Sequence, residues 1–458
     1  MLKENLLKEK TGKLYARFCV SGVLGMIGIS LYVLADTFFI ANGIGQTALA
    51  ALNIAIPIYS LITAVGLLFG IGCCSSYSVS KGMGDTKKAE GYFTFAVLGG
   101  AAVGLVFLLL GLFLSENIAF ALGATAETIG HCKTYLQVIL GFAPMFILNQ
   151  VFLAFMRNIE RPKAAMASML AGSIFNIVMD YVTVYIWGWG MFGAAIATAF
   201  SPIVGMGITL PFIASKKSGL KLTRTRITGG MVKNVFAGGT SSFVVELSVG
   251  IVVLIFNMIM LRLIGNIGVA AYGIISNVSI VAYSIFTGMG QALQPIVSTN
   301  YGAAQKSRIK STLGTAVVAA LAAGIGFYLV GLFGAEWITA AFNGENSIEL
   351  ARITENGIRV YFIAFIPMGI NVVMSYFFQS VLAMRQSLTI SLMRGFVLIA
   401  VFALLLSNIL GVTGVWLSAL AAEAVTIVYA LISAGKWFKL DIALKQEKKE
   451  SRKAAEAR

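Results

Sequence analysis

The sequence predicts an all-α polytopic membrane protein with about twelve transmembrane helices in two six-helix lobes related by an internal parallel repeat. Three observations lead to this prediction. Of the 458 residues, 58% are hydrophobic and only 12% are charged, whereas soluble domains carry about 25% charged residues. Apolar runs long enough to cross a bilayer, which takes about 20 helical residues, follow one another to the end of the chain. The two halves also resemble each other.

The apolar runs define the predicted helices one by one. The first run is too long for the core of a signal peptide and has no clear cleavage site after it, so we expect it to be retained. Several runs exceed the bilayer thickness, which predicts tilt or extension into water. The spans are expected near residues 16–41, 52–80, 90–114, 134–156, 164–187, 192–214, 235–263, 268–297, 311–334, 353–382, 386–409 and 412–435.

The distribution of basic residues predicts the orientation of these spans. The net charge is +15, but no folded basic domain lies outside the spans, so we expect no nucleic-acid partner. Most Lys and Arg residues fall before the first span, in alternate loops and in the tail; Arg157 is assigned to the loop after span four, and Arg394 to the turn between spans ten and eleven. The positive-inside rule then places both termini in the cytoplasm of a multi-pass protein of the cell membrane.

An internal repeat divides the chain. Residues 45–52 resemble residues 265–272, and residues 70–90 pair with 288–308, at an offset of about 220 residues. Six spans per copy is an even number, so both copies enter the membrane the same way round. Transporters use such parallel repeats, with the binding site between or within the halves; an old duplication without moving parts is the alternative. The predicted units are an N-terminal lobe (1–214), a cytoplasmic linker (215–234), a C-terminal lobe (235–435) and a basic cytoplasmic tail (436–458).

Polar side chains inside the first lobe are the candidate functional residues. Asp36 lies in the outer part of span one, and a carboxylate in hydrocarbon costs about 2.5–3.5 kcal/mol on insertion scales. Asp180 and Asn176, one turn apart in span five, and Thr198 in span six are expected at the same depth. Two adjacent carboxylates repel, so the pair would hold a proton readily. The same four oxygen-bearing side chains would also suit Na⁺, and a purely structural role for Asn176 and Thr198 in bonding helices remains the alternative.

The second lobe has no acid at the position equivalent to Asp36, where Phe256 and Asn257 fall. Glu246 in span seven is either a substrate or proton site or a structural hydrogen-bonding group, whereas Glu423 in span twelve is expected to be structural. Other polar side chains are candidates for lining a cavity that takes greasy substrates: Tyr32, Asn149, Gln150, Asn277, Gln291, Gln294, Asn371 and Gln379.

No catalytic motif is found in the sequence. GxSxG, Walker A and HExxH patterns are all missing, and the four cysteines have no metal-ligand spacing. We therefore expect no enzyme and no cofactor. Transport would be driven by a gradient of H⁺ or Na⁺, with Asp36, Asn176, Asp180 and Thr198 as the ligands if the ion is Na⁺.

Several stretches together resemble the multidrug and toxic compound extrusion (MATE) transporters. They are LADTFFIANGIGQTALAALNIAIPI, GIGCCSSYSVSKGMGDTKKAE, FNIVMDYVTV, GMFGAAIATAF and GQALQPIVSTNYGAA, and the resemblance extends over residues 14–435. It implies two lobes in a V shape and antiport of cationic or lipophilic compounds against H⁺ or Na⁺. It also implies that Asp36, Asn176, Asp180 and Thr198 form the cation and proton cluster of the first lobe, as in the DinF-like branch of the family.

The sequence departs from the family pattern in two places. Asn371 or its neighbours stand where another branch has an aspartate in the tenth helix, which weakens a second-lobe cation site, although Glu246 matches the family's acid in the seventh helix. The proline often found in the first helix of the DinF-like branch is missing, and the glycines at 22, 25 and 28 are expected to supply the bend instead.

These observations predict a secondary active multidrug efflux antiporter, with small organic cations or lipophilic drugs and membrane lipid as partners and a monomer as the expected state. A flippase for lipid-linked saccharides is the first alternative. It would need a cavity rich in basic residues, and the spans of the first half, as assigned above, contain no interior Arg or Lys. A channel or a structural membrane protein is the second alternative, and a measurement of flux stoichiometry would separate either from an antiporter.

Overall fold

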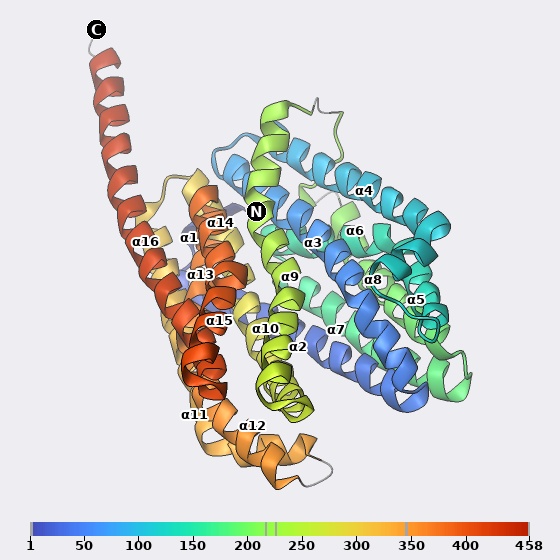
Figure 1. Ribbon diagram of the computed structural model, residues 1–458. Coiled ribbons are helices and arrows are strands. Elements are labelled where there is room, and N and C mark those ends of the chain that lie inside the picture. Colours follow the sequence, from blue (N-terminus) through green and yellow to red (C-terminus); the bar gives the residue numbers. More distant parts are fainter. Residues whose placement is uncertain (1–2, 216–217, 225–226, 344–346, 457–458) are drawn as a thin grey trace.

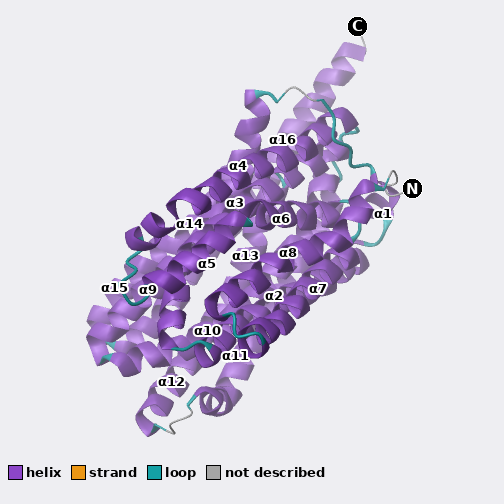
Figure 2. Ribbon diagram, turned by 90° about the vertical axis from the view of Figure 1, so that its right-hand side faces the viewer, coloured by secondary structure: helices purple, strands orange, loops and turns teal. Residues whose placement is uncertain are grey.

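The protein is built of helices packed into a single bundle. The computed structural model describes residues 3–215, 218–224, 227–343 and 347–456, and every regular element in these ranges is helical (Figure 2). Eleven helices are long and apolar enough to cross a membrane. A bent pair, α5 (Ile129–Gly141) and α6 (Ala143–Asn158), with 50° between its members, supplies a twelfth span. The predicted fold class is confirmed.

The first lobe contains the helices up to α8. Gly45, with φ of 117°, forms the tight turn between the first two spans, and a conformation of this kind favours glycine. Asp85 caps α4, because its carboxylate accepts from the backbone amide of Lys88 at 3.0 Å. Besides α5 and α6, the lobe comprises α1 (Lys3–Lys8), α2 (Thr11–Gly43), α3 (Gln46–Gly82), α4 (Thr86–Ala121), α7 (Pro162–Asp180), the π-helical η1 (Tyr181–Ile186) and α8 (Gly190–Ala214).

The second lobe repeats this order. Its second helix, α10, has 37 residues, the same length as α3, and a π-helical segment again interrupts its fifth span. The elements are α9 (Gly229–Ile264), α10 (Asn266–Gly302), α11 (Lys306–Phe342), α12 (Ile348–Tyr361), η3 (Phe362–Ala364), α13 (Phe365–Ser380), α14 (Met384–Leu392), η4 (Met393–Val397), α15 (Leu398–Leu410) and α16 (Val412–Glu456).

Figure 1 shows the first lobe, blue to green, on the right and the second, yellow-green to red, on the left. In Figure 2 both ends of the chain lie toward the upper right of the bundle, called the terminal side below, and α12 lies at the opposite, lower left end. The predicted tail is not a separate element, since α16 continues through residue 456. In the predicted linker, α9 already begins at Gly229, and residues 216–217 and 225–226 lie outside the described part.

The lobes meet through closely packed backbones on the terminal side. A methyl group on Gly22 of α2 would lie 2.7 Å from the carbonyl oxygen of Gly288 in α10, and a methyl group on Gly82 at the end of α3 would collide with the Thr299 carbonyl. Gly72 packs in the same way against Val235 of α9. Because glycine has no side chain, two helices can approach to backbone contact at these positions.

Side-chain hydrogen bonds join the same surfaces. Asn158 of α6 donates to Gln294 of α10 at 3.0 Å, and Gln294 donates to Ser75 of α3 at 3.3 Å. Tyr15 donates to the carbonyl of Met289 at 3.2 Å. These hydrogen bonds between the two lobes all lie in this terminal half. We call these contacts the terminal seam; they show a conformation closed on the terminal side.

The glycines of α2 lie at close contacts with neighbouring helices. α2 is continuous from Thr11 to Gly43. A methyl group on Gly25 would lie 2.7 Å from the Met169 sulfur, and one on Gly28 would lie 2.8 Å from Leu170. These glycines therefore do not interrupt the helix, and their small size lets α2 contact α7 and α10 on two sides.

The short helix α1 bridges the two lobes at the terminal side. The backbone carbonyl of Leu6 accepts from Asn300 and Arg308 of the second lobe, each at 3.0 Å. Its backbone amide meets the carboxylate of Glu160, in the α6–α7 turn of the first lobe. Burial raises the pKa of Glu160, although Lys81 and Arg17 oppose this shift. A groove of about 90 Å³ lies beneath Leu6, bordered by Asn158 and Thr299.

Replacing Gly302 with Val is expected to open the terminal seam. A methyl group there would collide with the Val79 carbonyl of the other lobe, and overpacking of this kind costs about 1–3 kcal/mol. That is enough to shift a two-state equilibrium by roughly tenfold. Cys73 and Cys74, both fully buried at α3, should then react several-fold faster with a water-soluble maleimide, measured by mass spectrometry of the labelled peptide.

The matched control is Gly314→Val, because nothing lies within 4 Å of a methyl group at Gly314. This variant should label at the wild-type rate. Equal labelling in Gly302→Val and Gly314→Val would contradict the assignment of Gly302 to the seam.

Candidate functional site

Two carboxyl groups meet inside the first lobe. Asp36 of α2 is 7% exposed, and Asp180, the last residue of α7, is completely buried. The two groups are close enough to share a hydrogen bond when one of them carries a proton. Within the described part of the chain, Asp36 Oδ1 and both carboxylate oxygens of Asp180 receive no hydrogen bond from a donor. Buried carboxylate oxygens without donors are costly and call for a proton or a cation.

Asn176 and Thr198 complete the group, as predicted. Asn176 Nδ2 donates to Thr198 Oγ1 at 3.2 Å, which leaves Asn176 Oδ1 without a partner among the described residues. The hydroxyl of Tyr135, on α5, is in hydrogen-bonding range of Thr198. Sequence reasoning missed Tyr135, because an aromatic residue in an apolar run carries no signal of its own. We call Asp36, Asn176, Asp180 and Thr198 the N-lobe cluster.

The N-lobe cluster offers only oxygen ligands. Four of its oxygens have no donor: Asp36 Oδ1, Asn176 Oδ1 and the two of Asp180. Such oxygens fit a hard cation such as Na⁺, and the two facing carboxyls equally fit a shared proton. The π-helix η1 starts directly after Asp180, and π-helical turns inside α-helices occur frequently at functional sites. The described residues contain no group of three or more His, Cys, Asp or Glu side chains arranged to hold a metal.

A tyrosine pair extends from this cluster toward the second lobe. The hydroxyls of Tyr32 on α2 and Tyr59 on α3 are 2.8 Å apart. Tyr32 lies within electrostatic range of Asp36, and Tyr59 within range of Glu246 on α9. Glu246 itself has no hydrogen bond or ion pair to a described residue. Glu246 is therefore an unpaired carboxylate of the second lobe that lies within electrostatic range of the first lobe, at Tyr59.

Arg394 is not in a loop, which corrects the sequence prediction. It lies in η4, is 7% exposed, and donates from Nη2 to Glu423 Oε1 of α16 at 3.0 Å. Asn371 Nδ2 donates to Glu423 Oε2 at 2.7 Å. Arg394 also lies over the ring of Tyr283, 5.6 Å from its centroid. This buried ion pair supports the structural role expected of Glu423, and Asn371 bonds to the same carboxylate inside the second lobe.

Arg157 is also not in a loop. It ends α6 and is only 6% exposed, because α6 continues to Asn158 and packs there against α10 through the Asn158–Gln294 bond. The first lobe therefore does hold an interior arginine, contrary to the sequence-based assignment. That argument against a flippase no longer stands.

Some of the other predicted lining residues bond neighbouring side chains, and the rest are half-buried. Gln294 belongs to the terminal seam, and Gln379 donates to Ser242 of α9 at 3.0 Å. Gln291 lies beside Tyr376. Asn149, Gln150 and Asn277 are half-buried, and the Oδ1 of Asn149 has no described donor.

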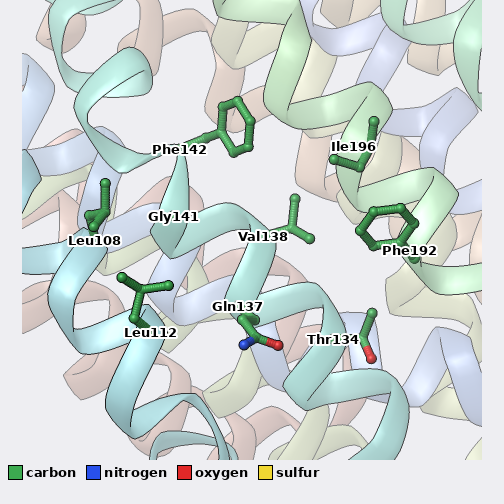
Figure 3. A pocket seen from close by; sticks show the side chains of 9 residues that line it. All are labelled: Leu108, Leu112, Thr134, Gln137, Val138, Gly141, Phe142, Phe192 and Ile196. Carbon is green, nitrogen blue, oxygen red and sulfur yellow. The ribbon is translucent and has the colours of Figure 1, made fainter.

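An apolar pocket lies apart from these residues. It has a volume of about 480 Å³ and lies at the α5–α6 bend, between α4, α5 and α8 (Figure 3). Leu112 and Phe192, both about half exposed, contribute to its mainly apolar lining. None of the predicted site residues borders it. We assign it to the outer, lipid-facing surface of the first lobe, since exposed leucine and phenylalanine side chains there are normal for a membrane-spanning bundle.

The family model described as MatE matches residues 23–182 and 242–405, one stretch in each lobe and more than half of the chain. Two similar curated proteins are both described as multidrug export protein MepA. One, from Staphylococcus saprophyticus, is 25% identical over 93% of this chain and 94% of its own length; the other, from Staphylococcus aureus strain MSSA476, is 24% identical over the same shares.

Solved structures share the fold. A multidrug resistance MATE family transporter of the MOP superfamily, in an outward-facing conformation, superimposes with a TM-score of 0.89 at 22% identity, covering 97% of this chain and 98% of that one. A MOP superfamily transporter from Pyrococcus furiosus gives 0.87 at 21% identity, covering 96% and 97%. At these identities the likeness establishes the fold.

Proposed function

We propose that this chain, which belongs to the MatE family of membrane transporters, exports cationic or lipophilic drugs in exchange for H⁺ or Na⁺ by alternating access. The family consists of transporters and not of enzymes. The single observation that carries the coupling proposal is the contact of Asp36 with Asp180 inside the first lobe, where no cationic side chain of the described residues neutralises either.

The coupling ion would bind at the N-lobe cluster. Two facing carboxylates cannot both stay charged in a site of low dielectric without a proton or a cation between them. Loading and unloading the ion changes the charge at the junction of α2, α7 and α8. Because Asp180 lies directly before the π-helical η1, a change at its side chain can be passed to the backbone of the fifth span.

The drug would bind between the lobes. The names of the relatives support multidrug substrates. Glu246 supplies an unpaired negative charge there, and Tyr59, Tyr283 and Tyr376 surround it within electrostatic range. A carboxylate beside aromatic rings is a favourable environment for a lipophilic cation, because ring faces attract cations.

Alternating access would use the terminal seam. Its contacts are glycine-to-backbone approaches and neutral hydrogen bonds, such as Asn158–Gln294, each of which contributes about 0.5–1.5 kcal/mol. The positive-inside rule identifies the terminal side with the cytoplasm. In the state closed on the terminal side, the drug would leave on the opposite, outer side. Ion binding and drug binding must favour opposite states for the two fluxes to be coupled.

Replacing Thr198 with Ala is expected to separate the two candidate ions. If Na⁺ drives transport, losing one oxygen ligand should raise the KM for Na⁺ roughly tenfold, equivalent to about 1.4 kcal/mol. If H⁺ drives transport, the pH dependence should persist and the rate fall by less than about twofold, because the two carboxyls remain to share the proton. Ethidium efflux at graded Na⁺ and graded pH measures both. Na⁺-driven efflux with an unchanged KM for Na⁺ would remove Thr198 from the sodium site, and loss of the pH dependence of H⁺-driven efflux would contradict the sharing of the proton by the two carboxyls.

A further inference from the structure

Two buried arginines in this chain differ in their partners. Arg394 is satisfied by the carboxylate of Glu423, at 3.0 Å, and by the ring of Tyr283. Arg157 is equally buried, at 6% exposed, but no hydrogen bond or ion pair joins its guanidinium to any described residue. A buried charge without a counter-ion costs several kcal/mol. Arg394 shows that the fold can supply a counter-ion, so the lack of one at Arg157 needs an explanation.

Arg157 directly precedes Asn158, whose side chain belongs to the terminal seam, at the end of α6. Its neighbour Asn158 donates to Gln294 of α10. One helical turn earlier on α10, the backbone at Gly290 packs against the ring of Tyr376 on α13. Arg157 is accordingly within electrostatic range of Tyr376. Gln291 is beside Tyr376 as well, and its Oε1 has no described donor.

Glu246 carries the opposite unpaired charge toward the same tyrosine. Ser242 of α9 accepts a hydrogen bond from Gln379 of α13, and the two helices run in opposite directions. One turn further from the terminal side on each helix, Glu246 therefore lies level with Tyr376. The electrostatic influence of both Glu246 and Arg157 on Tyr376 agrees with this placement. An unpaired anion and an unpaired cation thus both lie within electrostatic range of one aromatic ring.

We propose that Arg157 binds the carboxylate of the transported compound while Glu246 binds its ammonium group, so that zwitterionic amphiphiles are a preferred substrate class. A guanidinium presents paired donors that match a carboxylate geometrically, and such charge-assisted bonds are short and strong. The ring of Tyr376 would lie between the two charged groups of the substrate. This inference rests on the proposed export function and adds the anionic half of the binding site.

The test compares one zwitterion with its own cationic ester. Full-length protein in proteoliposomes transports norfloxacin, norfloxacin ethyl ester and ethidium, for wild type and Arg157→Gln. The ester keeps the amine and ring system but lacks the carboxylate. We expect Arg157→Gln to raise the KM for norfloxacin at least tenfold while changing the KM for the ester and for ethidium less than twofold. Glu246→Gln should weaken transport of all three compounds, because each carries a cationic group.

Two results would overturn the proposal: an equal loss for norfloxacin and its ester, which indicates a structural role, or unchanged norfloxacin transport. If Arg157→Gln does not fold, Arg157→Lys replaces it. This variant retains the charge but not the paired donors, so the KM should rise several-fold for norfloxacin alone, and an equal effect on the ester would again contradict the proposal. Wild-type protein that moves none of the three compounds would instead refute the export function itself.

Discussion

Replacing Asp36 with Asn is expected to abolish ion-driven drug transport while leaving the protein folded in the membrane. Asn has nearly the shape of Asp but cannot carry the charge that a proton or Na⁺ neutralises. Asp180 would then have no second carboxylate beside it. Asn176, one turn earlier on α7, and Thr198 on α8 would remain in place. We expect the gradient-driven rate of ethidium efflux to fall at least 100-fold, and Asp180→Asn to behave in the same way.

Exchange of labelled for unlabelled ethidium across proteoliposomes, with no ion gradient, provides the internal comparison. It requires drug binding and lobe movement but no net ion flux, so both variants should retain more of it than of driven transport. Asp85→Asn is the matched control, since Asp85 caps α4 outside the lobes' interior and Asn caps helices equally well. Full gradient-driven resistance in Asp36→Asn cells would contradict the assigned role.

Replacing Arg394 with Met should cause the largest loss of stability. The substitution leaves Glu423, which is 1% exposed, with only the amide of Asn371 as a polar partner. Removing one member of a buried ion pair costs about 3–5 kcal/mol. The apparent Tm of the purified protein should therefore fall by several degrees. It is measured from the fraction that still elutes as a single species after heating.

A double variant isolates the charge effect. Arg394→Met combined with Glu423→Leu removes both charges, and apolar replacements of a complete buried pair are often neutral in stability. We expect the double variant to recover most of the lost Tm. A single variant as stable as wild type, or a double variant less stable than the single one, would show that the pair does not act through mutual neutralisation.

The N-lobe cluster could be predicted from the sequence because its members are rare in their surroundings. An aspartate such as Asp36 within a long apolar run is conspicuous, and helical geometry places Asn176 and Asp180 on one face. Their common depth followed from counting residues along spans of known direction. The structure added Tyr135, whose position beside Thr198 depends on packing between α5 and α8 that no local pattern encodes.

The arginines were assigned incorrectly for a related reason. Arg157 directly follows predicted span four, and Arg394 lies eight residues into predicted span eleven, and both were grouped with the basic residues of the neighbouring loops. Whether such an arginine reaches water or turns inward depends on distant partners: Glu423 is 29 positions from Arg394, and Gln294 is 136 positions from Asn158. The terminal seam is likewise made of long-range approaches, so the contacts of its glycines could not be predicted from the sequence.

Drug uptake into inside-out membrane vesicles, with a pH gradient and a Na⁺ gradient imposed one at a time, tests the proposed coupling most directly. The account predicts that one of the two gradients drives ethidium or norfloxacin movement in the wild type, and that the same gradient drives none in Asp36→Asn. No response of the folded wild-type protein to either gradient, or an equal response in the variant, would contradict the claim that Asp36 and Asp180 couple ion flow to export.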